Sequence, residues 1–287
     1  MERAGKKAAV IMVALLGASA AWAADNHKQV KLNIAANGVV NVVNNSGSVT
    51  VKPGAARQVV VNYTTNSDKI EVDANGIPSG QRVEIRTHAI QGQKPTPEES
   101  RVDYEIAVPA GVSLIISTAT APITVEDLSG DISLSSDTGQ ITVRGVNNSF
   151  VHIRGVTAPV MLNNVTGVHA EITSMGGAIQ MSSVSGPKIS ARTTTGNITY
   201  EGDCSGGGTY DLSTHSGLIN VTLPESASVD LSAQSVSGTV QNDFPLTAKQ
   251  HTSFVPSPGR SFAGTSHAGS SSMALQSFSG KIRVKQQ

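Results

Sequence analysis

Six polar side chains recur at one point of a repeated pattern, at intervals of 19 or 21 residues: Ser133, His152, Glu171, Ser190, Asp211 and Asp230. A repeat that stacks on itself would place them in one column, with neighbours about 5 Å apart. Serine, histidine and glutamate are the residue types of a nucleophile, a general base and the acid that orients the base. Every position of a stacked repeat produces such neighbours, however, so the pattern favours a polar outer face over an active site.

The same column raises the question of a metal site, because Asp211 and Asp230 fall on successive repeats and could share a cation. A hard cation such as calcium prefers six or more oxygen ligands. No aspartate-rich turn or glycine- and aspartate-rich nonapeptide repeat accompanies the pair, and the triple glycine 206–208 occurs once. The seven histidines show neither H-x-x-x-H nor H-E-x-x-H spacing. We therefore predict no metal site, no cofactor site and no catalytic residue.

A second column of outward residues is neutral: Thr124, Thr142, Met161, Gln180, Thr199, Asn220 and Gln241. Such a flat strip could bind a glycan or a partner protein through polar contacts, or it could reflect only the residue types that favour strands. N-x-S/T strings at Asn147, Asn164, Asn197 and Asn220 fall in or beside the strand pattern, so we interpret them as repeat composition. The one cysteine, Cys204, lies in the turn sequence Gly-Asp-Cys-Ser-Gly. We expect it to be exposed, dispensable to the fold and able to pair only with another molecule.

The elements that would hold these columns are short strands, marked by apolar residues at i and i+2. The spacing between successive pairs is mostly 9 or 10 residues, and the pairs begin at Leu114, Ile123, Ile132, Ile141, Val151, Val160, Ala170, Ile179, Ile189, Ile198, Tyr210, Ile219, Val229 and Val240. Such regularity fits either an antiparallel meander or a solenoid.

Alternate pairs differ, and this difference decides between the two folds. In one set the residue two before the pair is always Gly or Ala: Ala121, Gly139, Ala158, Gly177, Gly196, Gly217 and Gly238. In the other set that position is mixed: Val112, Gly130, Ser149, Val168, Pro187, Gly208 and Ala227. A period of 18 to 21 residues with two unlike strands predicts an all-β fold, a parallel β-solenoid with two strands per coil. In that register Ile179 and Ile198 are interior neighbours, whereas Gln180 and Thr199 face outward.

The solenoid does not extend evenly over the chain. Residues 24–103 carry apolar pairs at looser spacing and are expected to form an N-terminal β region or cap, with residues 87–101 as an exposed excursion. Residues 104–242 hold the regular repeat. Residues 243–272 are rich in proline, glycine and serine and are expected to form a second loop excursion. The pattern returns in residues 273–287, which we expect to rejoin the same ladder.

The N-terminus has the three parts of a secretory signal peptide: Arg3, Lys6 and Lys7, then an apolar run, then Ala21-Trp22-Ala23. A retained membrane anchor is the alternative, but the apolar run is short for a spanning helix. We expect residues 1–23 to be removed, with no transmembrane span in the mature chain. Lys+Arg and Asp+Glu are equal at 21 each, so no strong field exists to attract nucleic acid. Aromatic residues are 3%, which argues against base-stacking platforms and aromatic sugar platforms.

One stretch also resembles a known family. A strand ends in Val108-Pro109-Ala110-Gly111, and Ser-Gly-x-Ile/Val units follow at residues 129–132, 237–240 and 279–282. In these features the chain resembles the DUF4097 putative adhesin family of bacterial envelope proteins over about residues 40 to 285. The resemblance implies an exported β-helical domain and supplies no catalytic motif.

Two functions follow as hypotheses. The first is an exported, non-catalytic envelope protein, in the periplasm or at the cell surface, that acts as an adhesin-like scaffold for a glycan, a protein or further copies of itself. The second is a β-helix polysaccharide lyase or hydrolase, which rests on architecture alone. Such an enzyme needs clustered carboxylates or basic residues in a groove, and the first column supplies only some of them.

Overall fold

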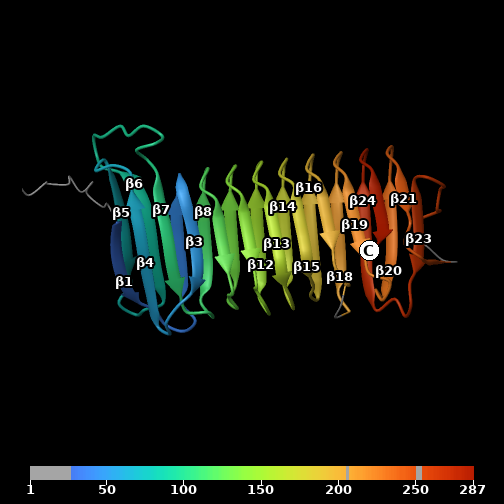
Figure 1. Cartoon of the computed structure of the whole chain (residues 1–287), viewed down its shortest axis with the longest axis horizontal. Coiled ribbons are helices and arrows are strands. Elements are labelled where there is room, and N and C mark those ends of the chain that lie inside the picture. Colours follow the sequence, from blue (N-terminus) through green and yellow to red (C-terminus); the bar gives the residue numbers. More distant parts are fainter. Residues whose placement is uncertain (1–26, 205–206, 250–253) are drawn as a thin grey trace, which may run out of the picture.

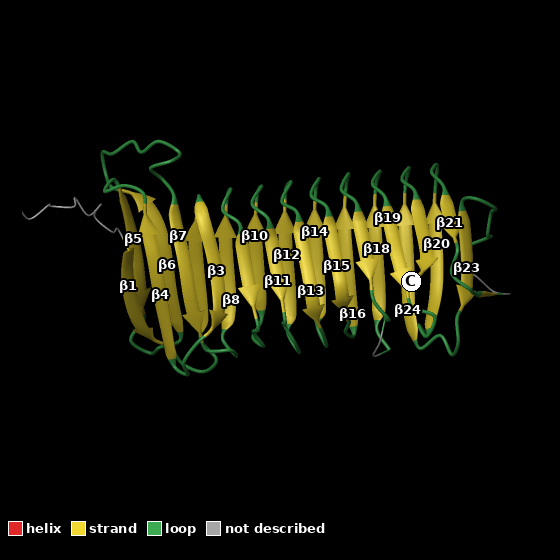
Figure 2. Ribbon diagram, viewed as in Figure 1, coloured by secondary structure: helices red, strands yellow, loops and turns green. Residues whose placement is uncertain are grey.

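The computed structural model describes residues 27–204, 207–249 and 254–287, so the expected signal peptide lies outside the described residues. Within these ranges the chain forms strands joined by turns and loops, stacked side by side into a rod (Figures 1 and 2). This is the expected all-β solenoid, and the β8–β19 stretch alternates strictly between two sheets. No helix in the described part of the chain is long and apolar enough to cross a bilayer.

Sheet A contains twelve strands among the described residues, in the spatial order β1 (His27–Asn33), β4 (Gln58–Thr65), β7 (Val102–Val108), β3 (Gly47–Pro53), β9 (Ile123–Glu126), β11 (Ile141–Arg144), β13 (Val160–Val165), β15 (Ile179–Val184), β17 (Ile198–Glu201), β19 (Ile219–Leu223), β25 (Ile282–Gln286) and β21 (Val240–Asn242). All neighbours from β7 to β21 run parallel, whereas β1 and β4 pair antiparallel at the end of the rod.

Sheet B contains thirteen strands in the same described part, in the order β22 (Thr247–Ala248), β23 (Ser261–Thr265), β20 (Val229–Ser235), β24 (Ser271–Ser277), β18 (Thr209–Thr214), β16 (Lys188–Thr193), β14 (His169–Ser174), β12 (Phe150–Gly155), β10 (Ile132–Ser136), β8 (Ser113–Thr118), β2 (Val39–Asn44), β6 (Arg82–Ala89) and β5 (Ile70–Gly76). Antiparallel strands again close both ends, β5 at one and β22 with β23 at the other.

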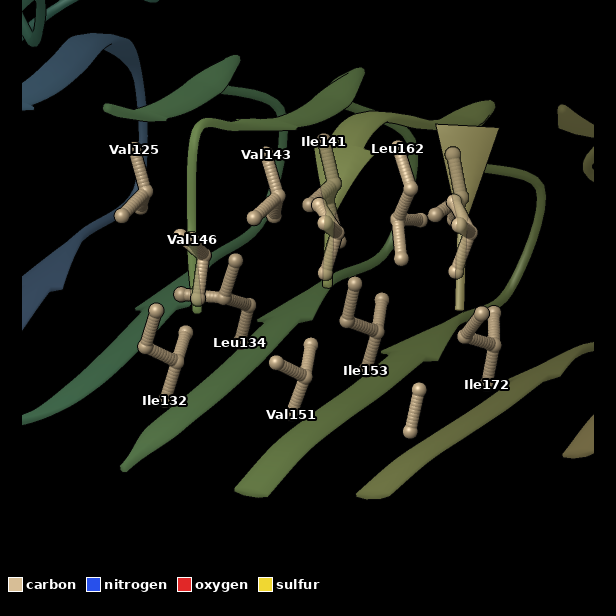
Figure 3. Packing of buried hydrophobic residues seen from close by; sticks show 14 of the residues in the cluster. Val125, Ile132, Leu134, Ile141, Val143, Val146, Val151, Ile153, Leu162 and Ile172 are labelled. Atoms are coloured by element: carbon tan, nitrogen blue, oxygen red, sulfur yellow. The ribbon is translucent and has the colours of Figure 1, made fainter. Parts of the chain in front are cut away.

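The interior is a narrow layer of aliphatic side chains contributed by both sheets (Figure 3). Ile179 pairs with Ile198 in register, and both are at most 1% exposed. The residues that follow them, Gln180 and Thr199, are exposed and half-buried respectively. The predicted register is therefore confirmed. A coil buries its apolar pair only against the next coil, so the stability of the rod comes from these interfaces.

The turn from sheet B to sheet A explains the small residues of the first set. In three neighbouring coils a buried hydroxyl ends the sheet B strand and accepts the backbone N–H of the glycine three residues later: Ser174 from Gly177 (2.9 Å), Thr193 from Gly196 (3.0 Å) and Thr214 from Gly217 (3.0 Å). A Cβ on these glycines would lie 1.9–2.1 Å from a carbonyl oxygen of the neighbouring coil. The turn therefore has no room for a side chain.

The C-terminal strands do not simply extend the rod. β24 lies between β18 and β20, and β25 lies between β19 and β21, so the last coil in sequence is the second from the end in space. The connection that allows this, expected as a loop over residues 243–272, contains the short strands β22 and β23. Strand β24 brings Met273 and Leu275 into the core at 0% and 1% exposure.

A related crossing occurs at the N-terminal end. β2 and β3 pair directly with β8 and β9, while β6 and β7 lie outside them, although β7 precedes β8 in sequence. Residues 39–53 thus form a regular coil of the ladder within the region expected to be a cap. The excursion between β6 and β7 projects from the rod (Figure 1).

Candidate binding site on the outer surface

The structure contains the first outer column from Ser133 to Asp211. Ser133, His152, Glu171, Ser190 and Asp211 pair in register across β10, β12, β14, β16 and β18. His152 Nδ1 lies 3.6 Å from Glu171 Oε2, and His152 Nε2 accepts a 2.9 Å hydrogen bond from Arg154 Nε. A histidine base must use one ring nitrogen to accept the nucleophile's proton while the other donates to the acid. Here Nε2 is engaged by a guanidinium, and the Nδ1–carboxylate distance exceeds a hydrogen bond.

The expected pairing of Asp211 with Asp230 is wrong. Strand β24 separates them: Asp211 pairs with Ala274, whereas Asp230 pairs with Ser272, two residues away along the strand. Arg192 lies 2.9 Å from Asp211 Oδ2, and Lys249 forms a close salt bridge with Asp230. The two carboxylates therefore have separate cationic partners. In the ranges that the structure describes, no group of three or more His, Cys, Asp or Glu side chains could hold a metal ion.

The second, neutral column is also interrupted by the inserted strand. Thr124, Thr142, Met161, Gln180, Thr199 and Asn220 pair in register, and the next member is Arg283, with Gln241 beyond it. Arg283 Nη2 lies 3.4 Å from Asp243 Oδ2, so the column includes a charged pair at this end and is not neutral along its whole length. Thr142, expected to face outward, is buried at 5% exposure. Glycan or protein binding on this column stays a prediction.

Cys204 differs from expectation, because its side chain is buried at 2% exposure. It belongs to a set of core residues at the turn from sheet A to sheet B: Leu128, Val146, Val165, Val184 and Cys204. The rings of Tyr200 and Tyr210 meet edge to face beside it, with centroids 5.5 Å apart. This coil is 21 residues long because it has one extra residue before Cys204 and one after it. The extra residues make the segment look like an exposed turn in the sequence.

Burial raises the pKa of the Cys204 thiol to about 12, so the thiol stays protonated near neutral pH. We expect Cys204 to react with a disulfide reagent such as Ellman's reagent at pH 8 at least about a hundredfold more slowly in the folded protein than in denaturant, because the thiolate is the nucleophile. We also expect a monomer on a non-reducing gel. Equal reaction rates in the two states would contradict the buried position.

A hollow on the outer surface lies where β18, β24 and β20 end, and it depends on the inserted strand. The residues just after these strands, His215, Phe278 and Val236, occupy the same corner of successive coils, because backbone bonds link Phe278 N–H to Thr214 O (3.3 Å) and Val236 N–H to Ser277 O (3.1 Å). The His215 and Phe278 rings stack with centroids 4.8 Å apart and planes 3° from parallel. Strand β24 thus inserts an aromatic ring between the other two side chains.

This hollow, which we call the corner groove, has a volume of about 350 Å³. Its lining contains four hydroxyl residues, two amides, two rings and one aliphatic residue: Thr193, Ser213, Thr214, Ser277, Gln234, Gln276, His215, Phe278 and Val236. None of these side chains is a carboxylate, lysine or arginine. The volume is at the lower end of the range for small-molecule sites.

The same corner on the coils from β12 to β20 carries, in spatial order, Val156, Met175, Thr194, His215, Phe278 and Val236, so two apolar pairs are separated by Thr194 and His215. We call this series the apolar corner. Val156, Met175, Phe278 and Val236 are between 43% and 62% exposed. Single exposed apolar residues are ordinary, whereas several along one edge are typical of interaction surfaces.

Sequence reasoning missed this site because the low aromatic content argued against an aromatic platform. The signal was present in the tetrapeptides that form the turn: Thr214-His215-Ser216-Gly217, Ser235-Val236-Ser237-Gly238 and Ser277-Phe278-Ser279-Gly280. Aligning them places His215, Val236 and Phe278 at one position. Only the strand order shows that Phe278 lies in the middle.

A family model described as Toastrack DUF4097 matches residues 39–285 of the chain. The chain belongs to this DUF4097 family. The match confirms the resemblance seen in the Val-Pro-x-Gly strand and the Ser-Gly-x-Ile/Val units. Among curated proteins, none matches the chain.

Solved structures similar to this DUF4097 protein include three that are named for a function. A "putative cell adhesion protein" from Clostridium sporogenes is 12% identical, with a TM-score of 0.30, and the match covers 91% of this chain and all of that one. A "putative adhesin" from Parabacteroides distasonis is 9% identical, with a TM-score of 0.43 and coverages of 92% and 98%. A "putative lipid binding protein" from the same species is 11% identical, with a TM-score of 0.41 and coverages of 91% and 97%.

Proposed function

We propose that this DUF4097 protein is an exported, non-catalytic binding scaffold of the cell envelope, adhesin-like in that a rigid rod presents a ligand-binding edge. The observation that carries the proposal is the apolar corner. Val156 and Met175 on one pair of neighbouring coils, and Phe278 and Val236 on another, are between 43% and 62% exposed, with Thr194 and His215 between the pairs, while the aliphatic interior is almost completely buried. Since stacked coils hold this edge straight, a partner meets a preformed surface and little ordering is needed on binding.

A binding role rather than a catalytic one is supported by the polar column on sheet B. His152 is engaged by Arg154 and faces Glu171, and Asp211 and Asp230 each have a cationic partner. These contacts are those of a charged outer face. The corner groove, by contrast, offers uncharged polar groups and a ring, which suit binding without chemistry.

Export is tested by cell fractionation followed by intact-mass measurement of the protein. We expect the chain recovered from the cell envelope to begin near Ala24, because Arg3, Lys6 and Lys7 precede a short apolar run and a small-x-small site. Intact-mass measurement of the envelope fraction checks this.

The matched control is a chain with Ala21 and Ala23 replaced by bulky residues, which should be exported with its N-terminus retained. Full-length protein in the cytoplasm would contradict the proposed function. So would failure of the purified mature chain to co-sediment with isolated cell envelopes.

A further inference from the structure

We propose that the corner groove binds a neutral glycan, with one sugar ring packed on Phe278 and its hydroxyls held by Gln234, Gln276 and Ser213. The inference rests on the proposed binding function and names its ligand class. It is argued from three features of the groove: its polar groups, its ring and its charge.

The two amides and the Ser213 hydroxyl are the polar groups of the corner groove that are free to bind, whereas the buried hydroxyls of Thr193, Thr214 and Ser277 hydrogen-bond to the turn backbone. Within the residues that the structure describes, the side-chain amides of Gln234 and Gln276 have no hydrogen-bond partner, and both residues are exposed. They lie in register on the neighbouring strands β20 and β24. An amide both donates and accepts, as does a sugar hydroxyl, so two amides side by side can each engage one hydroxyl of the same ring.

The ring of Phe278 supplies the apolar contact that a sugar needs. It is 51% exposed, so a large part of it meets solvent in the free protein. The stack with His215, 4.8 Å between centroids, holds its orientation. The electron-rich face and the edge of an aromatic ring both offer apolar area to the C–H groups of a pyranose. Because the ring is already oriented, little side-chain entropy is lost when the ligand binds.

The charge around the groove selects a neutral ligand. The lining carries no carboxylate, lysine or arginine. Two arginines flank the groove, and both are engaged: Arg192, in register beside Ser213, is paired with Asp211 at 2.9 Å, and Arg260 Nη1 donates to the backbone oxygen of Val236 at 3.3 Å. An acidic sugar would have to draw a guanidinium away from its present partner to replace the water around its carboxylate. An acyl chain would leave the amides of Gln234 and Gln276 buried and unpaired. A neutral glycan can pack its C–H groups on the Phe278 ring and form hydrogen bonds with the polar groups through its hydroxyls.

The test uses the purified mature chain and calorimetric titration with neutral gluco-, galacto- and manno-oligosaccharides. We expect binding of at least one of them, weakened about tenfold by Phe278→Ala and severalfold by Gln276→Ala, since buried ring contacts dominate such interfaces. Phe150→Ala is the matched control. Phe150 is 61% exposed on the same sheet and also lies beside a histidine, His169, with ring centroids 5.2 Å apart, but it is outside the groove. It should leave affinity unchanged.

Three results would overturn the inference: no binding to any neutral oligosaccharide, binding that Phe278→Ala leaves intact, or binding only of uronate oligosaccharides. Uptake onto phosphatidylcholine vesicles that is lost in Phe278→Ala, without oligosaccharide binding, would assign the groove to lipid and also overturn it. In each case an envelope-located chain that still co-sediments with envelopes leaves the proposed function standing. Thermal melting of each variant verifies that it is folded, and Gln276→Ala provides a second, independent substitution.

Discussion

Ile179→Asp is expected to lower the free energy of unfolding by about 4 kcal/mol, because it buries a carboxylate without a partner. Ile179 is 1% exposed on β15. Its neighbours in register are Val160 on β13 and Ile198 on β17, both fully buried, so the new carboxylate would have hydrocarbon on both sides. Thermal melting followed by circular dichroism measures the effect. In a stacked array the damage falls on the interfaces with the two neighbouring coils.

The control is the next residue of the same strand. Gln180 is exposed on the outer face of sheet A, and Gln180→Asp introduces the same group one position away. We expect it to cost about 0.5 kcal/mol. A one-residue slip of the strand would exchange the two faces. Equal losses of melting temperature in the two variants would therefore refute the observed register.

The repeat could be predicted because two independent periods agree. Apolar pairs at i and i+2 identify the buried face of each strand, and the Gly or Ala before alternate pairs identifies the turn that precedes that strand. Gly177, Gly196 and Gly217 carry that second signal, and a Cβ on any of them would meet a carbonyl oxygen of the adjacent coil at 1.9–2.1 Å. The requirement for a small residue arises from contact between neighbouring coils, so small residues recur once per coil. That is why the pattern distinguishes a solenoid from a meander.

The order of the coils could not be predicted in the same way. Apolar pairs report which face of a strand is buried, and any coil of the ladder can pair with any other. Gly280 stacks on Gly217, with a Cβ-to-carbonyl distance of 1.9 Å, and Gly238 stacks in turn on Gly280 at 2.1 Å. The reverse order would satisfy the same local rules. Sequence order favours adjacent placement, so the insertion of β24 and β25 was missed, and with it the true register of Asp230.

Two residues also have surroundings that the sequence pattern does not predict, because those surroundings depend on coil length and coil order. Cys204 sits among turn-forming residues, but the longer coil turns its thiol inward beside Tyr200 and Tyr210. Phe278 gains its neighbours, His215 and Val236, only through the inserted strand. Composition counts aromatic residues without locating them, and a single ring in the right place is enough to form a groove.

Gly177→Ala is expected to destabilise the rod by about 3 kcal/mol, because overpacking against backbone cannot be relieved by a side-chain rotation. The new Cβ would lie 1.9 Å from the carbonyl oxygen of Ala158 and 2.9 Å from Ser174 Oγ. The backbone would have to move, which also threatens the hydrogen bond from Gly177 N–H to Ser174. Urea unfolding followed by circular dichroism measures the loss.

Gly176→Ala is the matched control, since the two glycines are adjacent in the same turn. A Cβ at Gly176 would lie 3.5 Å from Thr195 Oγ1, an ordinary contact, so we expect a change near zero. Ala158 already occupies the equivalent corner one coil earlier, where Gly155 stands in place of the hydroxyl, and at Ala121 the Thr118 hydroxyl donates to the Ala121 carbonyl. Where the hydroxyl instead accepts the N–H of the turn, as Ser174, Thr193 and Thr214 do, that turn residue is glycine. Equal stability of the Gly177→Ala and Gly176→Ala proteins would show that a coil with Ser174 can open as the Ala158 coil does, and would refute this account of the corner.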